Sequence, residues 1–226
     1  FEEEMPNAAT KPLFDLAASL KIGFYLGYAE KCVEDGAVHR YNTAILVDRD
    51  GKIVGKYRKV HLPGHSEFVP SYPWQHLEKR YFEVGNLGFP VWRTMGGVMG
   101  MCICNDRRWP ETYRVMGLKG AEVIMLGYNT PTANRESNTI EPPHLRMMHN
   151  QMSMQMGAYQ NGAWVVGVAK AGAEDGFDMM GGSVICAPSG EIVAMARTVG
   201  DELISVDADL DDCTFNKTTI FNFAAH

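Results

Sequence analysis

The sequence predicts a single mixed α/β domain that covers all of residues 1–226. Strand-like apolar runs alternate with amphipathic, helix-like segments along the chain. We find no internal repeat, low-complexity tract or linker that would divide it. A content of 46% hydrophobic and 21% charged residues is typical of a globular protein, and a chain of this length buries a sizeable core.

The first third of the chain predicts one helix and three strands. Residues 12–20 are expected to be helical, with one apolar face made of Leu13, Phe14, Leu16, Ala17 and Leu20. Strands are expected over residues 22–28, 41–47 and 52–60. Asp50-Gly51 supplies the turn of a hairpin between the last two. Residues 61–88 are expected to form a long loop, and such loops in compact domains are often functional.

Strands and helices alternate more regularly in the rest of the chain. Strands are expected over residues 98–104, 123–126 and 164–169, and helices over 109–118 and from about 143 to 160. A polar loop over 128–143 precedes the second helix. Ser189-Gly190 joins a hairpin of residues 183–187 and 191–196. A last strand is expected over 203–206, and residues 209–214 are expected to begin a terminal helix.

Charge and cysteine content exclude several classes of protein. A net charge of −6 argues against non-specific nucleic-acid binding. No apolar run approaches the roughly 18 residues that a membrane span requires, and residues 1–6 do not resemble a signal peptide. The five cysteines are scattered apart from Cys102 and Cys104, which predicts no disulfide framework and suits the reducing cytoplasm.

The most informative stretch surrounds Cys104. The apolar run that ends at Cys104 stops abruptly at Asn105-Asp106, and Pro110 suits the first turn of a following helix. A thiol at this junction lies near backbone N–H groups and the positive end of a helix dipole. Arg107 and Arg108 add two guanidinium groups that can bind a carboxylate. Position alone also fits a buried structural thiol, because cysteine is among the most buried residue types.

Lys59 is a second candidate active-site residue, although its sequence context also fits a surface residue. It could belong to a solvated basic face within Lys56–Gly64, or it could close a strand where active-site residues concentrate. The chain has no Gly-x-Ser-x-Gly elbow, phosphate-binding glycine loop or zincin motif. No metal is expected, since Cys102-x-Cys104 has no second pair and His144 and His149 are five residues apart.

Four motifs together resemble the nitrilase superfamily: Lys56–Pro63, His76–Glu83, Cys104–Glu111 and Gly127–Pro131. The Asn-Asp-Arg-Arg-Trp-Pro-Glu sequence after Cys104 is most similar to the branch that hydrolyses N-carbamoyl-D-amino acids. The resemblance extends over essentially the whole chain. It implies an α-β-β-α sandwich that packs face to face into homodimers and often homotetramers, with no metal or cofactor.

The resemblance also implies roles for single residues. Cys104 matches the nucleophile, Lys59 the lysine of a Glu-Lys-Cys triad, and Glu78 a second glutamate that positions the lysine and the substrate. Asn129, Thr130, His61 and His76 match positions around the substrate. From the chemistry, we expect the Lys59 ammonium and the Asn105 N–H to stabilise an oxyanion, and Arg107 and Arg108 to bind a substrate carboxylate.

Two departures from the family pattern accompany this resemblance. The triad glutamate lies on an early strand ahead of the segment that matches Phe1, so about one strand–helix–strand unit is expected to be missing and the functional protein to be longer. The C-terminal arm also looks short. Gly181-Gly182-Ser183 stands where the family usually has Gly-His-Ser, so substrate shape or local hydrogen bonding is expected to differ there.

The predicted function is hydrolysis of the N-carbamoyl group of an N-carbamoyl (D-)amino acid by a cysteine nucleophile. The products would be the free amino acid, carbon dioxide and ammonia, formed through a carbamoyl-cysteine. One alternative is a related amidase that acts on another amide or a nitrile, against which the two arginines argue. The other is an inactive, truncated homologue that acts only in assembly.

Overall fold

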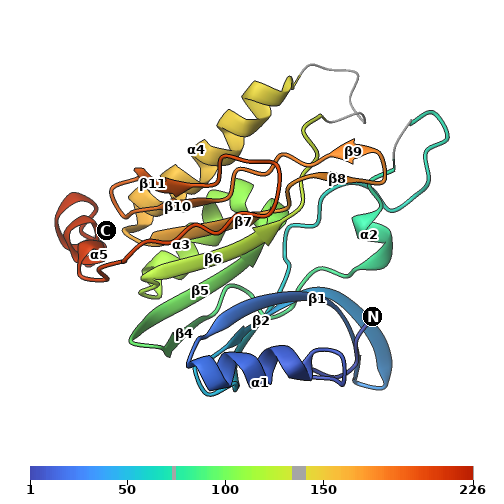
Figure 1. The fold of residues 1–226 in the computed structure, drawn as a ribbon, viewed down its shortest axis with the longest axis horizontal. Coiled ribbons are helices and arrows are strands. Elements are labelled where there is room, and N and C mark those ends of the chain that lie inside the picture. Colours follow the sequence, from blue (N-terminus) through green and yellow to red (C-terminus); the bar gives the residue numbers. More distant parts are fainter. Residues whose placement is uncertain (73–74, 134–140, 226) are drawn as a thin grey trace.

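The computed structural model describes residues 1–72, 75–133 and 141–225, which form an α-β-β-α sandwich (Figure 1). Helix α1 (Lys11–Leu20) covers the outer face of a sheet made of β1 (Phe24–Glu34), β2 (Ala37–Val47) and β3 (Ile53–Arg58). The second sheet has the order β11-β10-β7-β6-β5-β4. Helices α3 (Pro110–Leu118) and α4 (Pro143–Asn161) cover its outer face.

The second sheet is parallel at its centre and antiparallel at both sides. Its central strands are β5 (Gly97–Ile103), β6 (Val123–Tyr128) and β7 (Trp164–Ala169), which pair in parallel. The flanking strands are β4 (Val91–Thr94), β10 (Val184–Cys186) and β11 (Ile192–Met195). The carboxyl ends of parallel strands meet at one edge of a sheet, where α/β proteins place their sites. Register pairs Ile103 of β5 with Gly127 of β6, so the residues that follow both strands lie together.

The buried run of β2 shows how the layers are joined. Ala44 and Leu46 belong to the main core cluster, together with Met101 of β5 and buried residues of the second sheet. The alternating residues Ile45 and Val47 pack with Phe14 of α1 instead. Because successive side chains of a strand point to opposite faces, this strand is apolar on both and ties the two layers together.

The strand that leads to Cys104 is buried throughout, from Gly97 to Ile103. Gly100 faces α3, where an added Cβ would lie 2.7 Å from the Met116 sulfur. The close approach of α3 to β5 therefore requires a glycine at this position. The turn after the strand is consequently held between two rigid elements.

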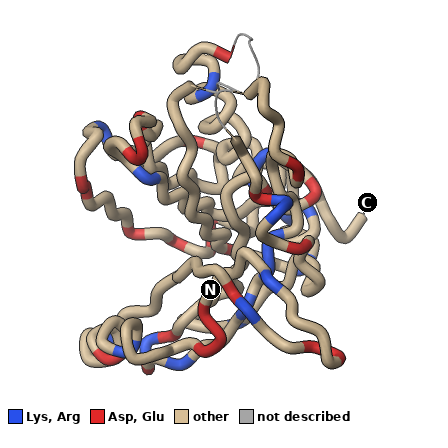
Figure 2. Tube along the Cα trace, turned by 90° about the vertical axis from the view of Figure 1, so that its right-hand side faces the viewer, with Lys and Arg blue, Asp and Glu red and all other residues tan. Residues whose placement is uncertain are grey.

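Several shorter elements complete the chain. The long loop over 61–88 contains one helical turn, α2 (Glu78–Tyr81). Strands β8 (Ala173–Glu174) and β9 (Phe177–Asp178) form a small separate hairpin, and the chain continues through α5 (Asp212–Phe215) into the π-helix η2 (Asn216–Ile220). In a view turned by 90°, acidic and basic residues are spread over both layers (Figure 2). Within the described ranges, no helix is both long enough and apolar enough to cross a membrane.

Three expectations differ from the structure: one strand, the buried face of α1 and the length of β1. Residues 203–206 form no strand, because Leu203 is 93% exposed and Glu202 organises a turn by accepting the N–H groups of Arg197 and Thr198. In α1, only Phe14 and Ala17 of the expected apolar face are buried, while its three leucines lie on the outer surface (Leu13, Leu16 and Leu20). β1 is longer than predicted and turns directly into β2.

Candidate active site

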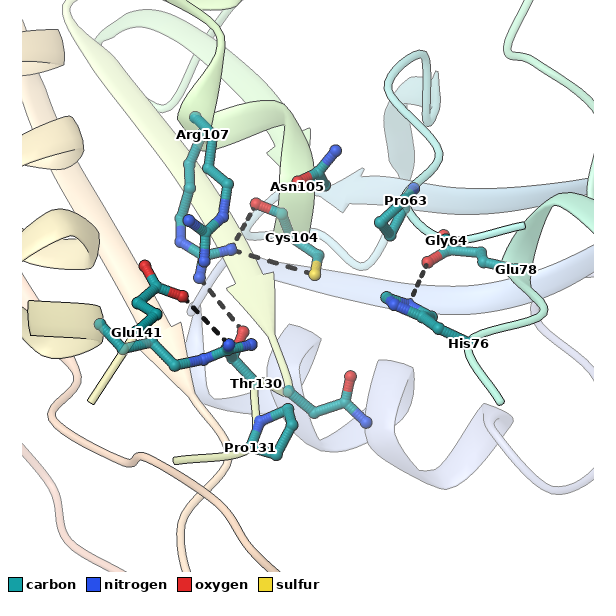
Figure 3. A pocket seen from close by; sticks show the side chains of 13 residues that line it. Pro63, Gly64, His76, Glu78, Cys104, Asn105, Arg107, Thr130, Pro131 and Glu141 are labelled. Atoms are coloured by element: carbon teal, nitrogen blue, oxygen red, sulfur yellow. Dashed lines mark hydrogen bonds and ion pairs between the residues drawn. The ribbon is translucent and has the colours of Figure 1, made fainter. Parts of the chain in front are cut away.

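Cys104 lies where β5 ends and the 3₁₀ turn η1 (Cys104–Arg108) begins. Its φ of +49° lies in the left-handed region, which non-glycine residues rarely adopt and which must be held by the surroundings. The side chain points into a cavity (Figure 3). Cys102, two residues earlier, is completely buried in the main core, and burial raises the pKa of its thiol well above the ordinary value. The structure thus gives different surroundings to two cysteines that stand only two residues apart in the sequence.

Asp106 holds the Cys104 turn in place. One carboxylate oxygen accepts the Ile103 N–H (2.9 Å) and the Tyr57 hydroxyl (2.7 Å). The other accepts the His61 backbone N–H (2.9 Å) and lies 3.0 Å from His61 Nδ1. The carboxylate is fully buried and bonds the turn to the end of β3. Asp106 stands inside the motif after Cys104, but the sequence alone does not indicate this role for it.

Arg107 is buried and joins three elements. Its Nε donates to Asn150 Oδ1 on α4 (2.6 Å), Nη1 to the Cys104 carbonyl (2.6 Å) and Nη2 to Thr130 Oγ1 after β6 (3.1 Å). The guanidinium also stacks on the Tyr128 ring at 4.1 Å. Nη1 lies 4.0 Å from the Cys104 sulfur. Because each nitrogen already has a protein acceptor, this arrangement favours a positioning role for Arg107 over the carboxylate clamp that the sequence suggested.

Lys59 and Glu78 form an ion pair beneath the cavity wall. Lys59 follows β3 and is 1% exposed, and its Nζ lies 2.5 Å from Glu78 Oε1. The same oxygen accepts from Asn42 Nδ2 (3.0 Å), and Oε2 lies 3.8 Å from His76 Nε2. Burial raises the pKa of Glu78, but the hydrogen bond from His76 and the charge and hydrogen bond of Lys59 outweigh burial and lower it. Glu78 is therefore a carboxylate at neutral pH.

The cavity at Cys104 has a volume of about 340 Å³, within the range of small-molecule sites. Every predicted site residue except Lys59 and His61 lines it. His61 lies behind the Cys104 turn instead, stacked on Trp109 with ring centres 4.8 Å apart. The lining residues are Pro63, Gly64, His76, Glu78, Cys104, Asn105, Arg107, Arg108, Asn129, Thr130, Pro131, Glu141 and Arg146.

Glu141 and Arg146 were missed by the sequence analysis, because no motif contains them. Arg146 Nη1 lies 3.2 Å from Glu141 Oε2, and His149 Nδ1 lies 2.8 Å from Glu141 Oε1. Burial raises the pKa of Glu141, but the His149 hydrogen bond and the charges of Arg146 and Arg108 outweigh burial and lower it. Only the fold brings this pair to the same cavity as Cys104. Figure 3 shows Glu141 on the wall of that cavity.

Positive charge dominates this side of the cavity. Loss of water around the Arg108 guanidinium lowers its pKa, and the positive charges of Arg107 and Arg146 lower it further. These three arginines outnumber the two lining carboxylates. The site therefore attracts an anionic ligand.

Gly181 and Gly182, where the sequence departs from the family pattern, are not among the residues that line the cavity. Gly181 and Gly182 adopt φ values of +55° and +66°, and an added Cβ at Gly182 would lie 3.0 Å from the Met147 methyl. A histidine would be strained at this position, so the departure from the family's Gly-His-Ser is built into the backbone. Within residues 1–72, 75–133 and 141–225, no group of three or more His, Cys, Asp or Glu side chains is placed to hold a metal ion.

Comparison with known proteins gives a consistent match. The profile of the Carbon-nitrogen hydrolase family matches residues 1–217. Similar proteins include a nitrilase of Pyrococcus abyssi (32% identity over 92% of this chain), a citrullinase of Francisella tularensis (34% over 75%) and an N-carbamoylputrescine amidase of Oryza sativa (30% over 76%). This chain spans 68% of the length of the first and 56% of the other two.

A solved structure of a carbon–nitrogen hydrolase has a similar fold. A carbon–nitrogen hydrolase from Helicobacter pylori superposes with a TM-score of 0.78 at 25% sequence identity. The match covers 94% of this chain and 71% of that structure. The agreement extends over both sheets and the helices that cover them, because almost all of the chain is included.

Proposed function

The chain belongs to the carbon–nitrogen hydrolase family, and on this premise we propose that it removes the N-carbamoyl group from N-carbamoyl amino acids with Cys104 as the nucleophile. The observation that carries the proposal is the position of Cys104. Its side chain extends from a turn with a left-handed backbone conformation, at the carboxyl end of β5, into a cavity lined by three arginines. The turn resembles in principle other strand-to-helix turns that expose a nucleophile.

In the proposed first step, the Cys104 sulfur attacks the ureido carbonyl carbon and forms a C–S bond. The backbone N–H of Asn105 donates to the oxyanion of the tetrahedral intermediate, and one such donor contributes about 3–4 kcal/mol. The resemblance assigns the Lys59 ammonium to the same oxyanion, although in this structure Lys59 is buried against Glu78 and does not line the cavity. The C–N bond to the amino acid then breaks, and its nitrogen takes up a proton. A carbamoyl group remains on the sulfur.

In the second step, water attacks the carbamoyl carbon and the C–S bond breaks. The carbamic acid that leaves decomposes to carbon dioxide and ammonia, and the thiol is restored. Glu78 already accepts from Lys59, so we assign it to holding the lysine. Over the first step the thiol proton passes to the departing nitrogen, so the amine gains the proton that the thiol loses.

The substrate class follows from the charge of the cavity. The arginine-rich lining of the cavity, with Arg108 as predicted from the sequence, favours a substrate with a carboxylate near the scissile group. The names of two relatives, citrullinase and N-carbamoylputrescine amidase, refer to compounds with a ureido group. Preference for the D-configuration, and assembly into a homodimer or homotetramer, rest on the resemblance and stay predictions.

A substrate panel tests this proposal. We expect ammonia and free amino acid to be released fastest from N-carbamoyl-D-amino acids, and more slowly from N-carbamoylputrescine and from an aliphatic amide. The Cys104→Ala variant is the control for contaminating activity. Faster turnover of the aliphatic amide would favour the related-amidase alternative, and no turnover of any substrate would favour the inactive homologue.

A further inference from the structure

The proposed steps at Cys104 do not use the ion pair of Glu141 and Arg146, yet both side chains line the same cavity. Arg146 is 8% exposed, and its Nη1 lies 3.2 Å from Glu141 Oε2. The pair is therefore a built part of the cavity wall. Its position raises the question of what the arginine binds when a ligand is present.

The start of α4 holds the pair together. Glu141 immediately precedes Pro142, the residue that caps this 19-residue helix, and Arg146 lies in the first turns. A negative charge near the N-terminus of a helix is favoured by its dipole. His149, further along α4, binds the second oxygen of Glu141 at 2.8 Å. Glu141 thus has a second partner that can retain it if Arg146 turns to a ligand.

The surrounding charges favour the binding of a ligand carboxylate in addition to the carboxylate of Glu141. Arg146 and Arg107 both repel the charge of Arg108 and contribute to its lowered pKa. Three guanidinium groups line the cavity, and each nitrogen of Arg107 already donates one hydrogen bond to a protein acceptor. Arg108 and Arg146 are consequently the cations through which the cavity wall can bind an incoming carboxylate.

We propose that Arg146 is a specificity-determining residue that binds the substrate carboxylate together with Arg108. The Glu141 carboxylate, which is paired with Arg146 in this structure, competes with the substrate carboxylate for it. The ligand class is an N-carbamoyl or similar N-acyl amino acid with a free carboxylate. This inference rests on the proposed function for the identity of the substrate, but binding tests it separately from turnover.

The test measures binding to the Cys104→Ala protein, in which no reaction depletes the ligand. The probes are an N-carbamoyl-D-amino acid and the same compound with an amide in place of its carboxylate, both titrated by calorimetry. Glu141→Gln removes the competing charge and keeps the side-chain shape. We expect this variant to bind the carboxylate probe about fivefold more tightly, because a partly exposed ion pair contributes about that much. Its affinity for the amide probe should be unchanged.

A gain in affinity cannot arise from loss of structure, so this variant is informative even if others fold poorly. Arg146→Met should weaken binding of the carboxylate probe by about tenfold or more, with little change for the amide probe. In the Glu141→Gln/Arg146→Met double variant, the gain from Glu141→Gln should disappear. The matched control is His144→Gln, a change at an exposed residue of the first turn of α4 that does not line the cavity.

Two results would overturn the inference. One is an unchanged or weakened affinity of Glu141→Gln for the carboxylate probe. The other is an equal loss for both probes in Arg146→Met. If the variants bind the two probes as expected but the protein with Cys104 intact does not hydrolyse the carboxylate probe, the proposed function fails while the inference stands.

Discussion

The ion pair of Lys59 and Glu78 gives a quantitative prediction. Lys59 is 1% exposed, and the Glu78 carboxylate lies 2.5 Å from its ammonium. Glu78→Gln keeps the size of the side chain and a hydrogen-bond acceptor but removes the negative charge. The ammonium then stays buried without a counter-ion, a change that costs 3–5 kcal/mol in typical proteins. Because Gln still accepts a hydrogen bond, we expect the free energy of unfolding to fall by about 3 kcal/mol.

Thermal unfolding measures this loss. For a chain of this size, about 3 kcal/mol corresponds to a decrease of roughly 6–12 °C in Tm. Displacement of Lys59 should also lower kcat/KM by about a hundredfold. The Glu78→Gln/Lys59→Met double variant removes both charges and should recover much of the stability but none of the activity. An unchanged Tm in Glu78→Gln, or a double variant less stable than the single one, would refute the argument from burial.

Three further predictions concern other charged groups. Arg108→Leu should raise KM for N-carbamoyl amino acids by about ten- to a hundredfold and much less for their amides, and equal losses on both would assign Arg108 to structure. Asp106→Asn places an NH2 donor among groups that are themselves donors. The free energy of unfolding, measured in urea, should therefore fall by about 2 kcal/mol, and turnover should fall with little change in KM. Wild-type turnover would contradict this. Burial raises the pKa of Glu30, but hydrogen bonds from Arg58, Lys56 and Thr43 lower it to about 2 from 4.5. Its contribution of about 3 kcal/mol is therefore present above pH 4.5 and lost as the pH falls towards 2, so Glu30→Gln should flatten the decrease in stability over that range.

Local chain chemistry made the Cys104 region predictable. The buried strand, its abrupt polar end and Pro110 at the first position of α3 all depend on neighbours in sequence, and all are confirmed. The hairpin turns at Gly51 and Gly190 are likewise confirmed, with φ values of +76° and +88°. In such segments the residue type alone selects the backbone conformation.

Contacts between distant residues were not predictable in the same way. Asp106 and His61 are 45 residues apart, and no periodicity links them. Arg107 appears in sequence as a free cation beside Arg108, and only the fold shows that Asn150 and Thr130 accept from it. Conversely, residues 203–206 have the composition of a strand but do not pair with another strand in the structure. Tertiary packing decided each of these cases.

Covalent capture of the reaction intermediate tests the central claim most directly. The chain is mixed with an N-carbamoyl-D-amino acid, quenched in acid within the first turnover, digested and analysed by mass spectrometry. We predict a carbamoyl group on the peptide that contains Cys104, and none on that peptide in Cys104→Ala, whereas Cys102→Ala should keep both the adduct and most of the activity. Hydrolysis that persists in Cys104→Ala, or a carbamoyl group found on Cys102 instead, would contradict the assignment of Cys104 as the nucleophile.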